Sequence, residues 1–467
     1  MGEPRWRPEV KELIYRKRTI RQVGIFGLGK SNVGVIYYLK RKYPNIAITL
    51  RQDSARLPKD VLRAVRFDRI LLGGASCEDV TEELVFLSPT VKRQRLATVE
   101  DARITSDAQF YLDNVTHPVL AVTGSDGKST TTTLASLMLS GKGRHTSALG
   151  NIGVAMTPHL DDVRATLAVA ELSSFQLMTF VPRTMRALIT NISENHLDFH
   201  TSMDEYLGCK YRIFEGCEEP VVNCDCPLTL RGAAGREVFC AYSMEKDEDE
   251  LAAIINARHY TTLRGGIIYV DSRAVLDTNE AKLRTRHNIN NLLAAISLTH
   301  GLCDEERVRE VAREFSGLRH RCEYVGTFSG VEYYNSSIDS TPLRTATTLS
   351  SFDGRLTVIL GGRSKGLDYA PLVRAIASKA SAVYLCGECA ADIKRALLCD
   401  SLFTSLGIPI YEYRTLEDAT EGCAIRSREG ERVILSPAST SFDAFSSFEE
   451  RGEKFKEAIR NYYYKRT

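Results

Sequence analysis

Residues 117–141 read HPVLAVTGSDGKSTTTTLASLMLSG, an apolar strand that runs into a glycine-rich turn and then into a helix rich in small residues. In this context the turn predicts a phosphate-binding loop, because glycines let backbone N–H groups approach phosphate oxygens. Lys128 can neutralise charge on the outer phosphates, and the Ser129 hydroxyl can ligate Mg²⁺. The loop is a shortened form of GxxxxGK[ST], since Val122 stands where the first glycine would fall.

A second glycine-rich turn lies near the N-terminus, in RQVGIFGLGKSNVGVIYYLKRKYP, residues 21–44. We expect a strand to end at Phe26 and a helix to begin near Ser31. The pattern is close to the dinucleotide fingerprint GxGxxG, but Asn32 occupies the third glycine position. A tight turn in any Rossmann-like domain explains it at least as well, and the helix N-terminus still favours an anionic group such as a pyrophosphate.

Three further strands are predicted in the last third of the chain, at LTVILGG (356–362), SAVYLCG (381–387) and RVILSPA (432–438). Alternation of strands and helices predicts an α/β fold. A chain of 467 residues has room for three domains of about 150 residues each. We expect a Rossmann-like N-terminal domain at 1–110, a central P-loop ATPase-like domain at 111–303 and a Rossmann-like C-terminal domain at 304–467.

The composition argues against several classes of partner. The chain has 61 basic and 59 acidic residues, a formal net charge of +2, which gives no electrostatic reason to expect nucleic acid or a membrane surface. The first 20 residues are charged and polar, without the apolar core of a secretory signal. Apolar runs of about 18 residues are missing, so no transmembrane helix is predicted. We therefore expect a cytoplasmic protein.

The 12 cysteines are scattered, which suits a reducing compartment better than a disulfide scaffold. Cys386 and Cys389 form a CxxC, but no second CxxC completes a zinc site. Their segment has the pattern of a strand end and a turn, so we expect ordinary structural thiols. Cys224 and Cys226 flank Asp225 in what we interpret as a loop.

Nine short strings occur in an order that identifies a family. TGSDGKST (123–130) resembles the TG[TS][ND]GK[ST]T loop of the Mur ligases and folylpolyglutamate synthetases. The other eight resemble further Mur ligase motifs: GNIG (150–153), AELSSFQL (170–177), NISENHLDFH (191–200), YLGCKYRIF (206–214), HNINNLLAA (287–295), GLRHRCEYV (317–325), GGRSKGLDY (361–369) and LSPASTSFDAFSSFEERG (435–452). The chain is therefore identified as a member of the Mur ligase family. AELSSFQL and the last two strings are similar to those of the members that add D-glutamate.

The resemblance implies an ATP- and Mg²⁺-dependent ligase that joins D-glutamate to UDP-N-acetylmuramoyl-L-alanine in peptidoglycan precursor synthesis. It implies an acyl phosphate and a tetrahedral intermediate, with ADP and phosphate as products. Because the reaction brings a carboxylate and a γ-phosphate together, the site needs cations. Two Mg²⁺ ions are expected, and the chain is expected to act as a monomer.

The resemblance also assigns residues to the nucleotide and the metal. The expected catalytic residues are Lys128, Glu171, His196, Lys210 and Arg321. The expected ATP-binding residues are Gly124, Ser125, Asp126, Gly127, Lys128, Ser129, Thr130, Asn288, Asn291, Arg321 and Ser336. The expected Mg²⁺ ligands are Ser129, Glu171, His196 and Lys210. Lys210 matches a family lysine that reacts with CO₂ to form a carbamate, a step that needs a neutral amine and hence a lowered pKa.

The two other substrates are assigned in the same way. The positions that match the UDP-substrate site are Lys30, Ser31, Ser88, Pro89, Thr90 and Asn151. The positions that match the D-glutamate site are Ser340, Lys365, Ser441 and Phe448. Phe448 has an alternative as core packing, because Phe442 and Phe445 precede it at spacings that suggest one helix face.

The segment YYNSSIDSTPLRTA (333–346) departs from the family pattern. Ser336 stands where an aspartate is usual, Ile338 where some members carry lysine, and Ser340 where threonine is usual. These changes bear on nucleotide affinity more than on the class of reaction.

Two alternatives stay open from the sequence. The first is another ligase of the Mur or folylpolyglutamate type, although no DNPR-like motif of a diaminopimelate-adding enzyme is present. The second is a degenerate nucleotide-binding member, suggested by Ser336. Phosphate release that depends on an amine separates a ligase from a binding module.

Overall fold

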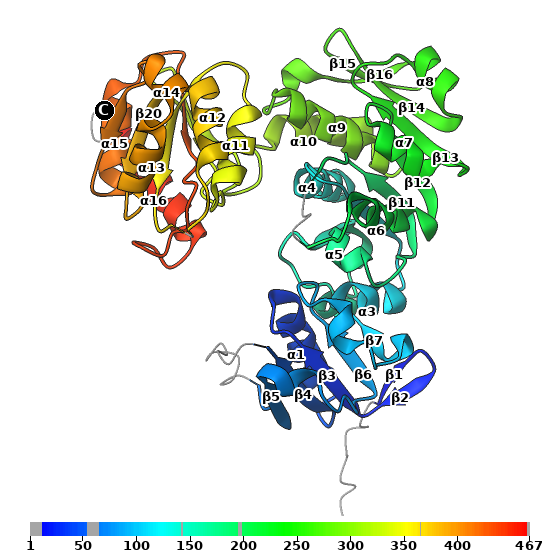
Figure 1. Ribbon diagram of the computed structural model, residues 1–467. Coiled ribbons are helices and arrows are strands. Elements are labelled where there is room, and N and C mark those ends of the chain that lie inside the picture. The colour runs from blue at the N-terminus through cyan, green and yellow to red at the C-terminus, as the bar shows by residue number, and fades with distance from the viewer. Residues whose placement is uncertain (1–11, 54–64, 142, 195–198, 365, 465–467) are drawn as a thin grey trace, which may run out of the picture. The chain divides into compact units, whose positions relative to one another are not determined.

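The computed structural model describes residues 12–53, 65–141, 143–194, 199–364 and 366–464 (Figure 1). Its contacts divide the chain into two compact units. The first unit comprises 1–280 with 290–311 and contains two large sheets. The second comprises 281–289 with 312–467 and contains one. In all three sheets most neighbouring strands are parallel, so the predicted α/β class is confirmed.

The first sheet has the order β5-β4-β3-β6-β7, and its strands are all parallel. The strands are β3 (Gln22–Phe26), β4 (Ala47–Gln52), β5 (Arg69–Leu72), β6 (Leu84–Leu87) and β7 (Ile104–Thr105). The helices are α1 (Lys30–Lys42) and α3 (Asp107–Asn114), and a hairpin of β1 (Leu13–Tyr15) and β2 (Arg18–Ile20) precedes them. The strand order reverses between β3 and β6, which is where open α/β sheets bind ligands.

The second sheet has the order β16-β15-β14-β13-β12-β11-β8-β10-β9. Its strands are β8 (Val119–Thr123), β9 (His145–Gly150), β10 (Ala165–Glu171), β11 (Thr184–Ile189), β12 (Cys217–Asn223), β13 (Val238–Ser243), β14 (Ala257–Arg264), β15 (Ile267–Val270) and β16 (Arg273–Asp277). Its helices are α4 (Lys128–Leu139), α5 (Ser174–Leu177), α6 (Met203–Glu215), α7 (Pro227–Ala233), α8 (Glu248–Ile254), α9 (Arg286–Thr299) and α10 (Glu305–Glu314). Strand β8 is buried along its whole length, as expected for a parallel strand covered on both faces.

The third sheet has the order β17-β18-β22-β19-β20-β21, with only β17 antiparallel. Its strands are β17 (Glu323–Phe328), β18 (Val331–Asn335), β19 (Leu356–Gly361), β20 (Ala380–Cys386), β21 (Ile410–Glu412) and β22 (Arg432–Leu435). Its helices are α11 (Pro342–Ser350), α12 (Ala370–Lys379), α13 (Ala390–Leu398), α14 (Ser401–Ser405), α15 (Leu416–Arg426) and α16 (Phe448–Tyr464). The three strands predicted from the sequence here are β19, β20 and β22.

Two predicted domain limits can be located on these elements. Residue 110 lies inside α3, and residue 303 lies in the turn between α9 and α10. Among the described residues, no helix is both long and apolar enough to cross a membrane.

Asn32 stands where the GxGxxG fingerprint has its third glycine, and its side chain has a structural role there. Its side chain is fully buried. Its Nδ2 donates to the carbonyl oxygens of Gly27 at 2.7 Å, Phe26 at 3.3 Å and Phe86 at 3.4 Å. One amide therefore joins the ends of β3 and β6 to the start of α1. A glycine could make none of these bonds. The stabilisation of this turn by the Asn32 side chain therefore explains the departure from GxGxxG.

Replacing Asn32 with Ala should destabilise the first sheet. Phe26 O still accepts from Ser88 N, but loss of the amide removes the 2.7 Å hydrogen bond to Gly27 O, a cost of about 1–3 kcal/mol. Urea unfolding should show the loss, and Tyr37→Ala, an exposed position on the same helix, is the matched control. Equal stability of the two variants would contradict this role for Asn32.

Candidate active site

The loop between β8 and α4 requires glycine at two positions. Gly124 has φ 146°, and a Cβ there would lie 1.9 Å from Thr190 Oγ1. Gly127 has φ 76°, and a Cβ there would lie 2.3 Å from Asn291 Oδ1. The backbone conformation disfavours a side chain at both positions, and an added Cβ would also displace Thr190 or Asn291, so the backbone at the start of α4 stays open to an anion.

Two lysines donate to the same backbone oxygen of this loop. Lys128 Nζ donates to Gly124 O at 2.9 Å and to Ser125 O at 2.7 Å. Lys210 Nζ, from α6, donates to Gly124 O at 2.6 Å. Two lysine amines therefore meet at the turn where the sequence predicts phosphate.

Lys210 is almost completely enclosed. It is 1% exposed, and its Nζ lies 4.7 Å from the centre of the Tyr206 ring. Burial, followed by the charge of Lys128, lowers the pKa of Lys210 well below the ordinary lysine value. The structure thus supplies the lowered pKa that carbamate formation needs, although the sequence context CKYR resembles an exposed surface.

The segment that follows β11 holds the loop in place, and the sequence did not assign it this role. Thr190 Oγ1 donates to Asp126 O at 2.6 Å. The Asn191 side chain accepts from Asp126 N at 3.0 Å and donates to Asp126 O at 3.1 Å. Ser125 Oγ shares a hydrogen bond of 2.9 Å with the Tyr206 hydroxyl. The signal available in the sequence was that Asn191 opens the string NISENHLDFH.

Glu171 has the features of a metal ligand. It ends β10 beside Val122 of β8, and it is 1% exposed. Its Oε1 accepts from Asn151 Nδ2 at 2.8 Å, whereas Oε2 has no hydrogen-bond partner among the described residues. A buried, unpartnered carboxylate oxygen next to a phosphate loop fits Mg²⁺, which prefers oxygen ligands. Ser129, the second residue of α4, is buried as well.

Two predicted site residues lie outside the described residues, His196 and Lys365. Asn291 contacts the loop, since its Oδ1 lies against Gly127 and 3.4 Å from Thr131 Oγ1. Asn288 lies one turn earlier on α9 and donates to Thr285 Oγ1 at 2.9 Å.

The predicted UDP-substrate residues of the first domain lie at the ends of two neighbouring strands. Lys30 and Ser31 begin α1 after β3, and Ser88, Pro89 and Thr90 follow β6. Strands β3 and β6 are paired in parallel, so both groups lie at the carboxyl edge where the strand order reverses. The hydroxyls of Ser88 and Thr90 are 3.3 Å apart.

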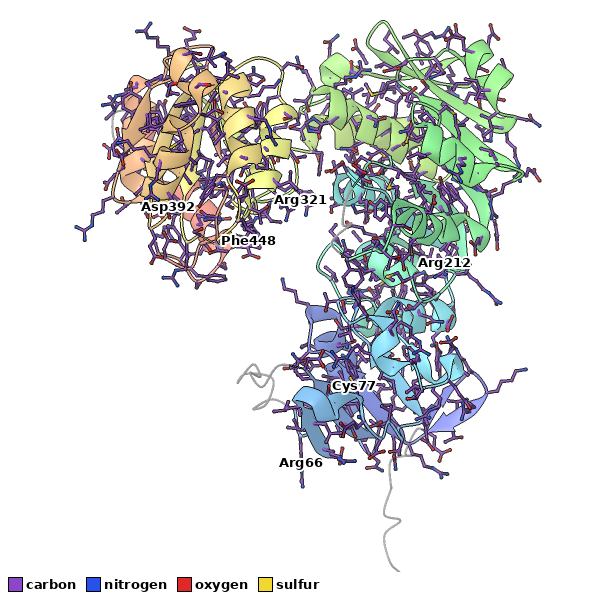
Figure 2. The ribbon with its side chains drawn as sticks, in the orientation of Figure 1. Arg66, Cys77, Arg212, Arg321, Asp392 and Phe448 are labelled. Carbon is purple, nitrogen blue, oxygen red and sulfur yellow. The ribbon has the colours of Figure 1, made fainter. Side chains whose placement is uncertain are left out.

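In the second unit, Ser336 is fully buried and its hydroxyl accepts from Cys322 N at 3.1 Å. Ser336 therefore orders the segment that carries Arg321. Within this conformation its side chain faces protein, not solvent, so it is no open nucleotide contact. Arg321 lies in this unit together with Phe448 (Figure 2).

The remaining positions predicted for D-glutamate are in the same unit. Ser441 is 3% exposed and Ser340 is partly buried. Phe448 is the first residue of α16, and its ring lies 6.1 Å from that of His320 in an edge-to-face arrangement. The alternative of a shared helix face with Phe442 and Phe445 is wrong, because both precede α16 and Phe442 is 60% exposed.

The CxxC is structural, as expected. Cys386 and Cys389 are both buried, and burial raises the pKa of each thiol, to about 12 for Cys386. Such thiols are poor nucleophiles near neutral pH.

Known proteins match this chain over its length. Residues 122–299 match the Mur ligase middle domain, and residues 320–439 match the Mur ligase glutamate ligase domain. The chain is 33% identical over 463 residues to the UDP-N-acetylmuramoylalanine–D-glutamate ligase of Clostridium novyi, which covers 97% of this chain and 98% of that protein. The chain belongs to the Mur ligase family. The ligase of the same name from Acetivibrio thermocellus is 33% identical over 453 residues, 94% of this chain and 96% of that one.

Solved Mur ligase structures share the fold. The UDP-N-acetylmuramate–alanine ligase MurC of Thermotoga maritima has a TM-score of 0.57 at 17% identity, covering 95% of this chain and 99% of that chain. A pseudomurein peptide ligase type C from Methanothermus fervidus has a TM-score of 0.55 at 16% identity, covering 94% and 99%. The predicted three-domain architecture is confirmed by this likeness.

Replacing Gly127 with Ala should lower the melting temperature more than Gly235→Ala does. Gly235 has nearly the same φ, 75°, but nothing lies within 4 Å of the place that an added methyl group would take. Gly235→Ala therefore measures only the backbone strain, about 1 kcal/mol, without a steric conflict. Adding Asn291→Ala to Gly127→Ala removes the steric conflict and should recover part of the loss. A Gly127→Ala effect no larger than that of Gly235→Ala would contradict the close approach.

Replacing Lys210 with Met should change how stability depends on pH. The unfolded chain keeps the Lys210 proton up to about the ordinary value of 10.5, whereas the folded chain releases it at lower pH. Wherever the folded chain has released this proton and the unfolded chain still holds it, folding costs a deprotonation, and this cost fades as pH rises toward 10.5. The melting temperature of the wild type relative to Lys210→Met should therefore rise as the pH approaches 10.5 from below. Lys17→Met, at an exposed lysine, should show no such trend.

Proposed function

We propose that this protein is the ATP-dependent ligase that joins D-glutamate to UDP-N-acetylmuramoyl-L-alanine, giving ADP and phosphate in peptidoglycan precursor synthesis. The observation that carries the proposal is the phosphate loop with Lys128 and a buried, low-pKa Lys210 at one carbonyl. The near full-length identity to relatives of that name supports the substrates.

In the proposed mechanism, the substrate carboxylate accepts the γ-phosphoryl group of ATP to form an acyl phosphate. The neutral amine of D-glutamate then attacks the acyl carbon, and the tetrahedral intermediate expels phosphate. The loop N–H groups and Lys128 hold the nucleotide phosphates and offset their charge. Arg321 is proposed to bind the γ-phosphate through its guanidinium, which requires that the C-terminal domain close on the central one.

The metal chemistry is proposed from the ligands present. Ser129 and Glu171 would hold one Mg²⁺, and His196 with carbamylated Lys210 would hold a second. When bound, these ions offset negative charge on the reacting carboxylate and phosphoryl oxygens. The unpartnered Oε2 of Glu171 supports the first site. The low pKa of Lys210 supports the second, since only a neutral amine reacts with CO₂.

The substrate-binding residues follow the family positions. Lys30, Ser31, Ser88, Pro89 and Thr90 are proposed to hold the UDP group, and their position at the carboxyl ends of β3 and β6 supports this. Asn151 is proposed to contact the muramoyl substrate while it orients Glu171. The residues proposed for D-glutamate are Ser340, Lys365, Ser441 and Phe448. Asn288 and Asn291 are proposed for adenine.

The remaining proposals concern the domain limits, the oligomeric state and the location of the protein. We propose domains at 1–110, 111–303 and 304–467, a monomer, and a cytoplasmic location where the nucleotide substrates are present. Ser336 does not argue for a degenerate member, because its hydroxyl has a structural role at Cys322.

Phosphate release from ATP tests the proposal, with UDP-N-acetylmuramoyl-L-alanine as acceptor and D-glutamate, L-glutamate, meso-diaminopimelate, L-lysine or no amine. We expect release with D-glutamate alone. Release with another amine would keep the mechanism and overturn the specificity. ATP binding without release under any condition would overturn the ligase function. Gly235→Ala should retain the activity, and Lys128→Ala should abolish it.

A further inference from the structure

A second cluster of ligating side chains lies on the antiparallel extension of the central sheet. His259 is in β14, Asp271 is in the turn between β15 and β16, and His300 follows the last residue of α9. One ligand atom from each residue lies within 4.8 Å of the other two. His259 Nδ1 is 2.7 Å from Asp271 Oδ2, and His300 Nε2 is 4.0 Å from the same oxygen.

These spacings match the demands of a small cation. Ligand atoms about 2.0–2.2 Å from a tetrahedral ion are about 3.3–3.6 Å apart. The observed 2.7 and 4.0 Å lie on either side of this value.

The carboxylate is already oriented. Asp271 Oδ1 accepts from Tyr260 N at 2.9 Å, which leaves Oδ2 directed at the imidazoles. Asp271 and Ser272 form a tight turn with φ 48° and 61°, so the position of the carboxylate is fixed by the hairpin. The two imidazole rings are in contact, with centroids 4.3 Å apart, and His259 lies edge-on against Phe239.

The surroundings suit a cation with an open coordination position. Arg186 lies over Phe239 and is paired with Glu219 at 2.7 Å, and Arg273 is paired with Glu305 at 2.9 Å. The side chains of His259, Asp271 and His300 are 30–41% exposed, and a surface hollow of about 690 Å³ reaches the last two.

We propose that His259, Asp271 and His300 form a binding site for a divalent transition metal, best matched by Zn²⁺. Two imidazoles and a carboxylate select such ions over Mg²⁺, which prefers oxygen ligands. The site is separate from the phosphate loop, because β11, β12 and β13 lie between β14 and β8. Bound metal joins β14 and the β15–β16 turn to the C-terminal end of α9, so it stabilises the central domain.

Zn²⁺ titration of the metal-free full-length protein, in competition with a chromophoric chelator, tests the site. We expect one Zn²⁺ per chain and a melting temperature that rises with Zn²⁺ but not with Mg²⁺. Asp271→Asn keeps the hydrogen bond to Tyr260 N yet removes the charge. It and His300→Ala should each weaken binding by about tenfold or more. His117→Ala, at a partly buried histidine whose ring nitrogen Nδ1 lies 3.2 Å from Pro118 O, should bind as the wild type does.

A second measurement uses the wild-type protein alone, so its result does not depend on whether the variants fold. Diethyl pyrocarbonate modifies accessible histidines, and Zn²⁺ should protect His259 and His300 while His117 reacts as before. Unchanged affinity in both ligand variants, or no protection of the two histidines, would overturn the proposal.

Discussion

Two lysine side chains donate to the carbonyl oxygen of Gly124, and the chemistry of the phosphate loop depends on how that crowding is resolved. Two ammonium groups at one oxygen repel each other, and the deeper one cannot keep its hydration. Lys210 is the deeper, and burial lowers its pKa well below the ordinary lysine value, whereas Lys128 lies at the start of α4. The same arrangement thus gives the two lysines different surroundings, as the proposed roles of phosphate binding and carbamate formation require.

The two lysines can meet at Gly124 O only because neighbouring residues hold the loop in one conformation. Gly124 leaves no room for a side chain against Thr190, and Thr190 and Asn191 bond Asp126 from the neighbouring strand end. Strands β8 and β11 are paired in parallel, so the phosphate loop after β8 and residues 190–191 after β11 lie side by side. Burial in a parallel sheet therefore fixes the loop more firmly than its own short sequence could.

The sequence predicted the parts of this site that are local and missed those that depend on packing. The strand, turn and helix around Lys128 follow from apolar runs and glycines, and the structure agrees with them. Lys210 could be singled out only by resemblance, because its burial comes from Tyr206 and the loop. Ser336 and Asn32 looked like departures from a pattern, but each bonds backbone groups distant in sequence. Such partners become visible only when the strands are placed.

The parallel and the antiparallel parts of the central sheet present different ligand atoms. Its parallel strands bring Glu171 and the phosphate loop to one edge, where backbone N–H groups and a free carboxylate oxygen favour phosphate and Mg²⁺. Its antiparallel hairpin instead brings Asp271 beside His259, because β15 runs back along β14 and ends next to Tyr260. Oxygen ligands gather at the first place and imidazoles at the second, so the two places differ in the ions they select. The hairpin can therefore respond to a transition metal without competing for the Mg²⁺ of the reaction.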